Sequence, residues 1–343
     1  MQILVSGAAG SIGQAIVPAL TAAGHGVTGL DLVETPGHAD GGWHVADCTD
    51  ADAVLDAVAA QPLDAVVHLA GNPAEASLPD SLASHVLTTA ALLDAMVTHG
   101  VGRLVYASSN HAVGRTPAGE LVGTDAAPRP DTYYGVSKIA AEALMQLFAD
   151  RHGIDAVACR IGSFLPEPVH RRHLATWLSP DDCVRMVEAA LAAPAPGFAT
   201  LYGISANTRA WWDLAPGRAL GYHPQDDAEA WAALLPQRPE DDFEASMVGG
   251  PFAGEGPGAR RSTESASRPE PFAQSAPAPA HHRVVVPAQH RLDRPQQRCR
   301  PGDPEIHLLL EVEPRAAVRR GQQPAHPPVE VATDRGLQAA DLP

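Results

Sequence analysis

The sequence predicts an α/β protein built on a doubly wound parallel sheet, followed by a small C-terminal cap and a proline-rich tail. Three observations support this prediction. Short apolar runs alternate with longer amphipathic segments over about the first 160 residues. A glycine pattern stands between the first apolar run and the first helical segment. From about residue 256 this periodicity is lost.

The alternation begins at the N-terminus. "QILVSGA" predicts a strand, "SIGQAIVPALTAAG" a helix and "GVTGLDL" a second strand. Residues 49–61 then predict a helix, with Asp47 or Thr49 as its N-cap, and "LDAVVHLAG" predicts a strand. A helix over residues 82–99 and the strand "RLVYASS" follow. Short β-branched runs separated by helices of about 10 to 15 residues indicate right-handed βαβ units, whose parallel sheet is buried on both faces.

The pattern continues into the second half of the chain. "KIAAEALMQLFADRHG" predicts a long helix that ends at Gly153, and "DAVACRIGSF" predicts another buried strand. The segment "SPDDCVRMVEAALAA" predicts a helix with Ser179 as its N-cap. An aromatic segment, "RAWWDLAPGRALGYHPQDDAEAW", comes after it. We expect residues 162–254 to form a small substrate cap over the carboxyl edge of the sheet, within one domain spanning residues 1–255.

Residues 256–343 have a different composition. Residues 251–343 contain 15 of the 32 prolines and only one short apolar run, "IHLLLEVE". A segment of this kind buries too little apolar surface to offset its chain entropy, so we expect disorder. Two other interpretations are a GC-rich coding sequence read out of frame and a small folded module. None of the three predicts chemistry for the tail.

Charge and hydropathy bear on the classes of partner. Residues 1–250 carry 29 acidic and 12 basic side chains, and an acidic body of this kind repels a phosphate backbone. The sequence has no apolar run near the ~20 residues that span a bilayer and no basic and apolar leader after Met1. These features predict a cytoplasmic protein with neither a nucleic-acid nor a membrane partner.

The glycine pattern predicts a dinucleotide site in a Rossmann-type domain. "GAAGSIG" spaces Gly7, Gly10 and Gly13 as GxxGxxG between a strand and a helix. Glycines at these positions permit a tight turn and the close approach of a pyrophosphate, which the N–H groups at the helix start then bind. We therefore expect cofactor contacts from this turn, formed by Gly7, Gly10, Ser11, Ile12 and Gly13.

Two acidic residues and a small-residue loop extend this predicted site. Asp31 follows the second strand 18 residues after Gly13, close to the ~20-residue offset at which an acid binds the adenosine ribose. Because a carboxylate there repels a 2′-phosphate, NAD is favoured over NADP. Asp47 ends the third strand, where it can read the adenine amino group or begin a helix. We also expect the cofactor to pass the end of the fourth strand, at Leu69, Ala70 and Gly71.

Tyr134 and Lys138 form the most informative pair in the chain. Lys138 is the only lysine among 24 basic residues. Four residues apart on a helix, the two side chains share one face. A tyrosine that acts as a base near neutrality needs a pKa about 3 pH units below its usual value of about 10, and a neighbouring ammonium favours the phenolate. We predict that Tyr134 is the general base and that Lys138 assists it and binds the cofactor.

A hydroxyl partner is expected from the preceding strand end. "YASSNHAVG" offers Ser108 and Ser109 there, and we predict that Ser109 polarises the substrate oxygen, with Asn110 beside it as an amide contact. A simple turn serine is the alternative.

These motifs together resemble a known family. "GAAGSIG", "YASSNHAVG", "YYGVSK" and "CRIGSFLPEP" resemble the extended short-chain dehydrogenase/reductase superfamily, and uronate dehydrogenases in particular, over residues 2–254. The resemblance implies NAD-dependent oxidation of the C1 hydroxyl of a hexuronate, such as glucuronate or galacturonate, to an aldarolactone. It also implies a Ser109, Tyr134 and Lys138 triad, a homo-oligomer, and contacts to the sugar acid from Ser109, Asn110, Ser163 and Arg172.

Some assignments remain open at this point. Pro73 stands where the resemblance implies a serine that touches the sugar, and proline offers neither a hydroxyl nor an N–H. Arg171 competes with Arg172 for the substrate carboxylate. His170 and His173 have HxxH spacing without a third ligand, so we predict no metal site. The alternative functions are an NAD-dependent sugar-nucleotide epimerase or dehydratase, and a non-catalytic NAD-binding protein.

Overall fold

A parallel seven-stranded sheet organises the computed structural model, which describes residues 1–35 and 42–253. The strand order is β3-β2-β1-β4-β5-β6-β9. The strands are β1 (Gln2–Ser6), β2 (Gly26–Asp31), β3 (Trp43–Val45), β4 (Ala65–His68), β5 (Arg103–Ser109), β6 (Asp155–Ile161) and β9 (Phe198–Gly203). The chain runs outward from β1 to β3 and returns to β4 on the other side of β1. This reversal opens a crevice at the carboxyl ends of β1 and β4. The predicted doubly wound α/β fold is confirmed.

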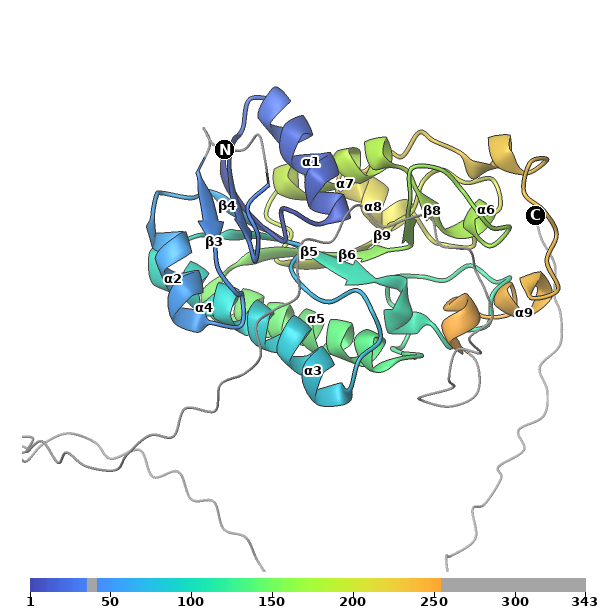
Figure 1. Cartoon of the computed structure of the whole chain (residues 1–343), viewed down its shortest axis with the longest axis horizontal. Helices are drawn as coiled ribbons and strands as arrows, with labels where there is room; N and C mark the ends of the chain where they lie inside the picture. Colours follow the sequence, from blue (N-terminus) through green and yellow to red (C-terminus); the bar gives the residue numbers. More distant parts are fainter. Residues whose placement is uncertain (36–41, 254–343) are drawn as a thin grey trace, which may run out of the picture. The chain divides into compact units, whose positions relative to one another are not determined.

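Helices cover both faces of the sheet (Figure 1). Helices α1 (Ser11–Ala22) and α7 (Pro180–Ala192) lie on one face, and α2 (Ala51–Ala59), α4 (Thr88–His99) and α5 (Tyr133–His152) lie on the other. A hydrophobic core lies on each face of the sheet. Within β1, Ile3 and Val5 belong to the core beneath α1 and α7, and Leu4 belongs to the core beneath α2, α4 and α5. Because successive side chains alternate across a strand, an uninterrupted apolar run is what a sheet buried on both faces requires.

The helix ends test several predictions. Gly153 ends α5 with a left-handed φ of 68°, and the Ser179 hydroxyl accepts the Asp182 N–H at the start of α7 at 3.0 Å, so both predictions are confirmed. The predicted cap of α2 was wrong. Asp50 is the residue whose carboxylate accepts the N–H groups of Asp52 and Ala53. Asp47 instead accepts the N–H of Thr49 at 2.8 Å, which holds the loop before the helix.

The helix expected over residues 82–99 starts earlier and has three parts. Helix α3 (Leu78–Leu82) passes into a π-helical turn, Ala83–Leu87, and then into α4. The whole stretch, Leu78–His99, is long and apolar enough to cross a membrane by length and composition alone. This differs from the expectation that the sequence has no apolar run near the length that spans a bilayer. The side chains of Leu92, Leu93 and Met96 are fully buried against the sheet, as in the core helix of a globular fold.

Residues 162–253 add short elements beside the carboxyl ends of β5 and β6 (Figure 1). Strands β7 (Ser163–Phe164) and β8 (Trp177–Leu178) pair with each other. Besides α7, this part of the chain forms the short helices α6 (His173–Thr176), α8 (Ala215–Ala219) and α9 (Asp241–Glu244). Trp212, from the aromatic segment, is buried against Tyr202 with ring centroids 4.8 Å apart. The predicted tail, residues 256–343, lies outside the described residues.

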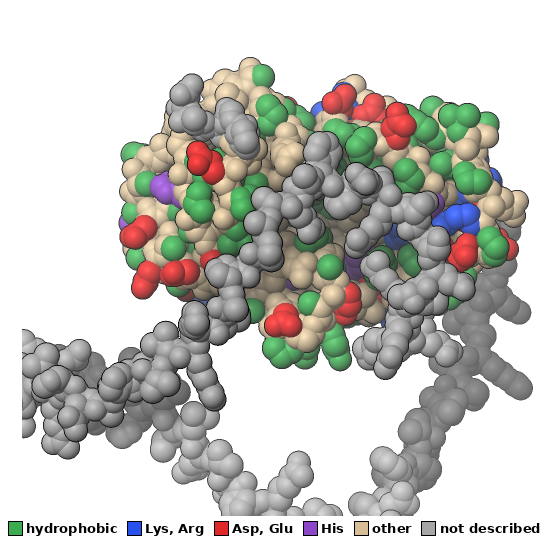
Figure 2. All heavy atoms as spheres, viewed as in Figure 1, with side chains coloured by type: hydrophobic (Ala, Val, Ile, Leu, Met, Phe, Trp, Pro, Cys, Tyr) green, Lys and Arg blue, Asp and Glu red, His purple; other side chains and the backbone are tan. Residues whose placement is uncertain are grey.

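The visible surface carries scattered charge (Figure 2). Acidic side chains are spread over this face among apolar ones and do not gather into one patch. The absence of nucleic-acid and membrane partners stays a prediction.

Candidate active site

A long crevice runs along the carboxyl ends of the central strands. It consists of two cavities, one of about 600 Å³ and one of about 420 Å³. Both are lined by Gly7, Gly10, Leu69 and Gly71, so they meet at the glycine turn. A crevice that joins two compartments at a glycine turn suits a ligand with two halves linked by a pyrophosphate.

The glycine turn leaves room for that pyrophosphate. Gly7 has φ +73°, and a Cβ there would lie 2.6 Å from the backbone nitrogen of Ala70. A Cβ on Gly13 would lie 2.4 Å from the carbonyl oxygen of Ala8. Helix α1 begins directly after Gly10, with no side-chain cap and no acidic residue in its first turn. Its first N–H groups therefore face the crevice with a positive dipole end, as an anionic ligand requires. The predicted residues Ser11 and Ile12 line the smaller cavity.

Three carboxylates line the larger cavity, and two of them, Asp31 and Asp47, were predicted. Asp31, at the end of β2, accepts the N–H of Ala9 at 2.9 Å, so it also fixes the glycine turn. Asp47 lies in the same cavity after β3, and Leu69, Ala70 and Gly71 form part of the wall after β4. The structure thus brings together all the residues predicted for the adenosine half. A cavity bordered by Asp31 fits a ribose with free hydroxyls and repels a 2′-phosphate.

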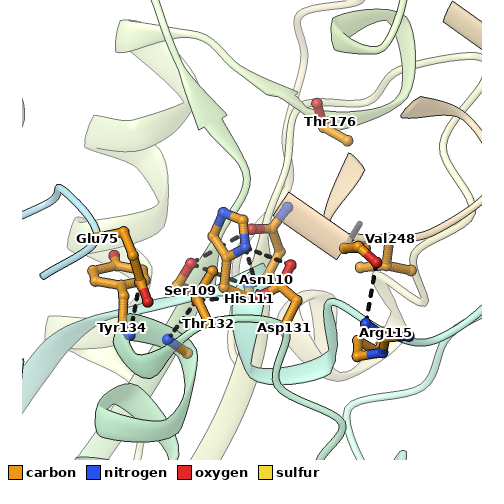
Figure 3. Close-up of polar contacts among 12 residues, drawn as sticks. Glu75, Ser109, Asn110, His111, Arg115, Asp131, Thr132, Tyr134, Thr176 and Val248 are labelled. Carbon is orange, nitrogen blue, oxygen red and sulfur yellow. Dashed lines mark hydrogen bonds and ion pairs between the residues drawn. The ribbon is translucent and has the colours of Figure 1, made fainter. Parts of the chain in front are cut away.

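The predicted triad lines the smaller cavity. Ser109 ends β5, and Tyr134 and Lys138 stand in the first two turns of α5. Ser109 and Tyr134 appear beside one another in Figure 3. The Lys138 Nζ atom lies 5.3 Å from the centroid of the Tyr134 ring and donates to the carbonyl oxygen of Ala107 at 2.7 Å. Residues from β5 and α5 therefore converge on one point, as the sequence predicted.

The electrostatics of this triad differ from the prediction. Burial raises the pKa of Tyr134 to about 12, and a hydrogen bond from Ser109 offsets only part of that effect. Burial also lowers the pKa of Lys138 to about 7, which the carboxylate of Glu142 partly opposes. A lysine that is only half charged near neutrality stabilises a phenolate weakly. The predicted fall in the pKa of Tyr134 was therefore wrong, because burial of the phenol outweighs the effect of Lys138 and Ser109.

Of the four residues predicted to hold the sugar, Ser109 lines the smaller cavity and the other three do not. Asn110 is buried directly after Ser109. The Ser163 hydroxyl is 2.9 Å from that of Thr176, and Arg172 donates from Nη1 to Ser163 at 3.3 Å. None of the three lines either cavity. The pKa of the Asp241 carboxyl is lowered mainly by the backbone N–H of Arg238, and Arg171 adds a smaller effect. The arginine that is hydrogen-bonded to Ser163 is Arg172.

Arg172 is a cation held by neutral groups. Its Nη2 donates to the carbonyl oxygen of Val248 at 2.9 Å, and its Nε is buried without a hydrogen-bond partner. Across residues 1–35 and 42–253, the structure shows no ion pair for Arg172 and several for other arginines. Burial lowers the pKa of its guanidinium, and the carboxylates of Glu244 and Asp131, which form no ion pair with it, oppose part of that effect. Such a group gains from an anionic partner.

Four aromatic residues of the smaller cavity, His85, His111, Phe164 and Phe252, were not predicted as site residues, and three of them form contacts around Tyr134 and His111. His85, from the π-helical turn, packs edge-on against Tyr134 with ring centroids 5.0 Å apart. His111 contacts both Tyr134 and Phe252, and its Nδ1 lies 2.8 Å from a buried carboxylate oxygen of Asp131. Figure 3 shows this pair next to Ser109 and Asn110. Of the three that form these contacts, only His111 carried a sequence signal, because it belongs to "YASSNHAVG".

One histidine of the HxxH pair accepts hydrogen bonds from the backbone. His173 Nδ1 accepts the N–H groups of Val169 and His170. The described residues contain no cluster of three or more His, Cys, Asp or Glu side chains arranged to hold a metal.

Comparisons with known proteins agree with this geometry. The model of the NAD dependent epimerase/dehydratase family matches residues 3–175. The chain is 36% identical over 261 residues to a uronate dehydrogenase from Pseudomonas syringae pv. tomato, covering 75% of this chain and 94% of that protein. An L-arabinose 1-dehydrogenase (NAD(P)(+)) from Haloferax volcanii is 36% identical over 253 residues, covering 66% and 97%.

A solved structure gives the same picture. The uronate dehydrogenase from Agrobacterium tumefaciens, complexed with NAD, superposes with a TM-score of 0.69 at 34% identity, covering 74% of this chain and 96% of that one.

Proposed function

Because this chain belongs to the NAD dependent epimerase/dehydratase family, we propose that it is an NAD-dependent dehydrogenase that oxidises the C1 hydroxyl of a hexuronate. The product of such an oxidation is an aldarolactone. The similarity to uronate dehydrogenases extends over nearly their whole length, which includes the C-terminal part beyond the nucleotide site. The sugar-nucleotide epimerase and the non-catalytic interpretation are not favoured.

The cofactor is NAD, which accepts a hydride when it is bound. In the proposal, the turn from Gly7 to Gly13 and the start of α1 hold its pyrophosphate, and Asp31 and Asp47 hold its adenosine half. Tyr134 and Lys138 face the remaining half from the smaller cavity. The chain's own residues then orient the sugar and move its proton.

The proton is removed at the end of β5. Ser109 donates a hydrogen bond to the C1 oxygen, and Tyr134 takes the hydroxyl proton. Because burial raises the pKa of Tyr134, a nearby cation must favour its phenolate during the reaction. The ammonium of Lys138, 5.3 Å from the centroid of the Tyr134 ring, is placed to do so. Phe252 adds an apolar side chain to the wall of the smaller cavity near His111.

The substrate class is inferred from the surroundings of the Arg172 guanidinium. Within the described residues, this guanidinium donates to neutral oxygens of Ser163, Thr176 and Val248, and its buried Nε has no partner. A sugar carboxylate would give it a directly bonded anion, which a guanidinium can hold through two parallel hydrogen bonds. Asn110, directly after Ser109, and Ser163, bonded to Arg172, would then be the nearest groups for hydroxyls of the ring. The absence of a hydroxyl at Pro73, which lines the smaller cavity, removes one such contact.

The test measures NADH formation with NAD or NADP and with glucuronate, galacturonate, glucose or arabinose. We expect turnover of a uronate with NAD, little with NADP, and little with the neutral sugars. Tyr134→Phe should abolish turnover and leave NAD affinity nearly unchanged, because the ring is kept and only the hydroxyl is lost. Tyr133→Phe, one residue earlier on the same helix, is the matched control. Oxidation of neutral sugars alone would refute the assigned substrate class.

A further inference from the structure

Glu75 joins two segments of the active site that are far apart in sequence. It lies in the loop between β4 and α3, and its carboxylate accepts the backbone N–H groups of Tyr133 at 2.9 Å and Tyr134 at 3.2 Å. Figure 3 shows Glu75 against Tyr134. We infer that Glu75 is a positioning residue, which fixes the first turn of α5 and thereby places the Tyr134 phenol. The catalytic part of this inference rests on the function proposed for Tyr134.

The start of α5 shows what Glu75 contributes. A helix begins with four N–H groups that have no partner within the helix. Here the four are the N–H groups of Thr132, Tyr133, Tyr134 and Gly135, because the N–H of Val136 already donates to the Thr132 carbonyl at 3.0 Å. The Thr132 hydroxyl accepts from Gly135 at 2.9 Å. The N–H groups of Tyr133 and Tyr134 need other acceptors, and the first turn of α5 contains no acidic residue. The chain therefore supplies an acid from a distant loop, where its charge also complements the helix dipole.

Hydrogen bonds also hold the start of the loop that carries Glu75, at Asn72. Asn72 accepts the Nε2 proton of His85 on its carbonyl at 3.0 Å, and its own N–H donates to the hydroxyl of Ser84 at 2.7 Å. The Asn72 side chain accepts the N–H of Ala74 at 3.0 Å, which closes a turn just before Glu75. The same His85 ring packs edge-on against Tyr134. Tyr134 is thus held at its backbone by one end of the loop and against its ring by a residue bound to the other end.

The position of the phenol should depend on this arrangement. Tyr134 is the second residue of α5, so fraying of the first turn moves its Cα and carries the hydroxyl away from Ser109. Catalysis is sensitive to such movement, since a displacement of about 1 Å can lower a rate by about 100-fold. A carboxylate that bonds both N–H groups restrains the turn more than an acceptor that bonds one.

The experiment compares Glu75→Ala and Glu75→Gln with the parent protein. Glutamine keeps one acceptor oxygen, so it can bind one of the two N–H groups, whereas alanine binds neither. Hydrogen–deuterium exchange of peptides that contain Tyr133 and Tyr134 reports the capping bonds without any substrate. The kcat for the oxidised sugar and the Kd for NAD report the catalytic consequence. Asp50→Ala is the matched control, because it removes a carboxylate cap with two N–H partners from α2, a helix that carries none of the triad.

We expect exchange at the two amides to be fastest in Glu75→Ala, intermediate in Glu75→Gln and slowest in the parent. The kcat should fall in the same order, by about 10- to 100-fold for alanine, with little change in the Kd for NAD. Asp50→Ala should leave kcat unchanged. Unchanged exchange in Glu75→Ala, or faster exchange with an unchanged kcat, would overturn the inference. A parent protein that oxidises no uronate would instead refute the proposed function, and the exchange result would still decide whether Glu75 fixes the turn.

Discussion

The ammonium group of Lys138 lies 4.7 Å from the centroid of the Tyr106 ring and 5.3 Å from that of Tyr134. Its Nζ donates to the carbonyl oxygen of Ala107, and the whole residue is only 4% exposed. Two aromatic rings and one carbonyl compensate a buried ammonium incompletely. The lowered pKa of Lys138 is the consequence, and it links the active site to the stability of the fold.

The first prediction concerns the loss of folding stability caused by burying the charged form of Lys138. The pKa of Lys138 is about 7 in the folded protein, whereas that of a free lysine is 10.5. Between these values the unfolded chain binds more protons, so the stability of the parent rises with pH across this window. The destabilisation caused by the buried ammonium of Lys138 is fully present below pH 7 and is lost above about pH 10.5. Lys138→Met should therefore be more stable than the parent at pH 7 by a few kcal/mol, and the difference should shrink as the pH rises.

Urea unfolding of the cofactor-free proteins at pH 7 and pH 9.5 measures this difference. Lys138→Arg is the matched comparison, because arginine stays charged throughout the window and should show no gain in stability with pH. A stability difference between the parent and Lys138→Met that does not change with pH would contradict the assigned pKa.

The second prediction concerns the ion pair behind the triad. Glu142 lies one turn after Lys138 and accepts from Arg160 at 2.8 Å and from Ser108 at 2.5 Å, and both charged side chains are almost fully buried. Removing one partner leaves the other charged and unpaired in the interior. Glu142→Ala should therefore destabilise the fold by about 3 to 5 kcal/mol, measured by urea unfolding.

An exposed pair provides the control for that measurement. Arg209 and Glu229 form a short ion pair on the surface, where solvent weakens the attraction. Glu229→Ala should shift the unfolding midpoint far less than Glu142→Ala. Equal shifts for the two variants would mean that burial of the Glu142 pair contributes nothing.

The sequence predicted the parts of the site that depend on local spacing. The glycine turn, Asp31, and the pair Tyr134 and Lys138 each follow from residues a few positions apart or from the end of a strand. The side chains that support Tyr134 could not be found in this way. Glu75 and His85 reach it from segments about 50 or more residues away in the sequence, and neither belongs to a recognisable motif.

Two other predictions were wrong, one because of burial and one because several neighbouring residues could cap the same helix. The pKa of Tyr134 depends on how many atoms of the fold surround its ring, a quantity that a four-residue spacing does not contain. The cap of α2 had three polar candidates within four positions. The backbone turn at Asp47 selects Asp50, because Asp47 is already bonded to the N–H of Thr49.

The third prediction separates two roles of glycine in the cofactor turn. Gly7 and Gly100 have nearly the same φ, +73° and +71°. A Cβ on Gly7 would meet the backbone of Leu69 and Ala70 at under 3 Å, whereas a Cβ on Gly100 would meet nothing within 4 Å. Both alanine variants pay the cost of a left-handed backbone, about 1 kcal/mol. Gly7→Ala should in addition push the turn away from β4 and weaken NAD binding.

Calorimetric titration with NAD tests this, because it requires no turnover. We expect Gly100→Ala to bind NAD as the parent does and Gly7→Ala to lose at least about tenfold in affinity, since the close backbone contact cannot relax. Parent-like NAD binding by Gly7→Ala would show that the dinucleotide does not pass the glycine turn.

The final prediction concerns the selectivity that Arg172 should confer. If its guanidinium holds the sugar carboxylate, Arg172→Ala removes one half of an enclosed charge pair, which typically costs about 2 to 5 kcal/mol. The kcat/KM for a uronate should then fall by roughly 30-fold or more, mainly through KM, while the low activity on glucose stays the same or rises. Arg172→Lys keeps the charge without the planar fork and should retain only part of the activity. Arg171→Ala is the matched control, because Arg171 lies near Asp241 and away from Ser163. An equal loss on acidic and neutral sugars would mean that Arg172 supports the loop at Val248 and does not recognise the carboxylate.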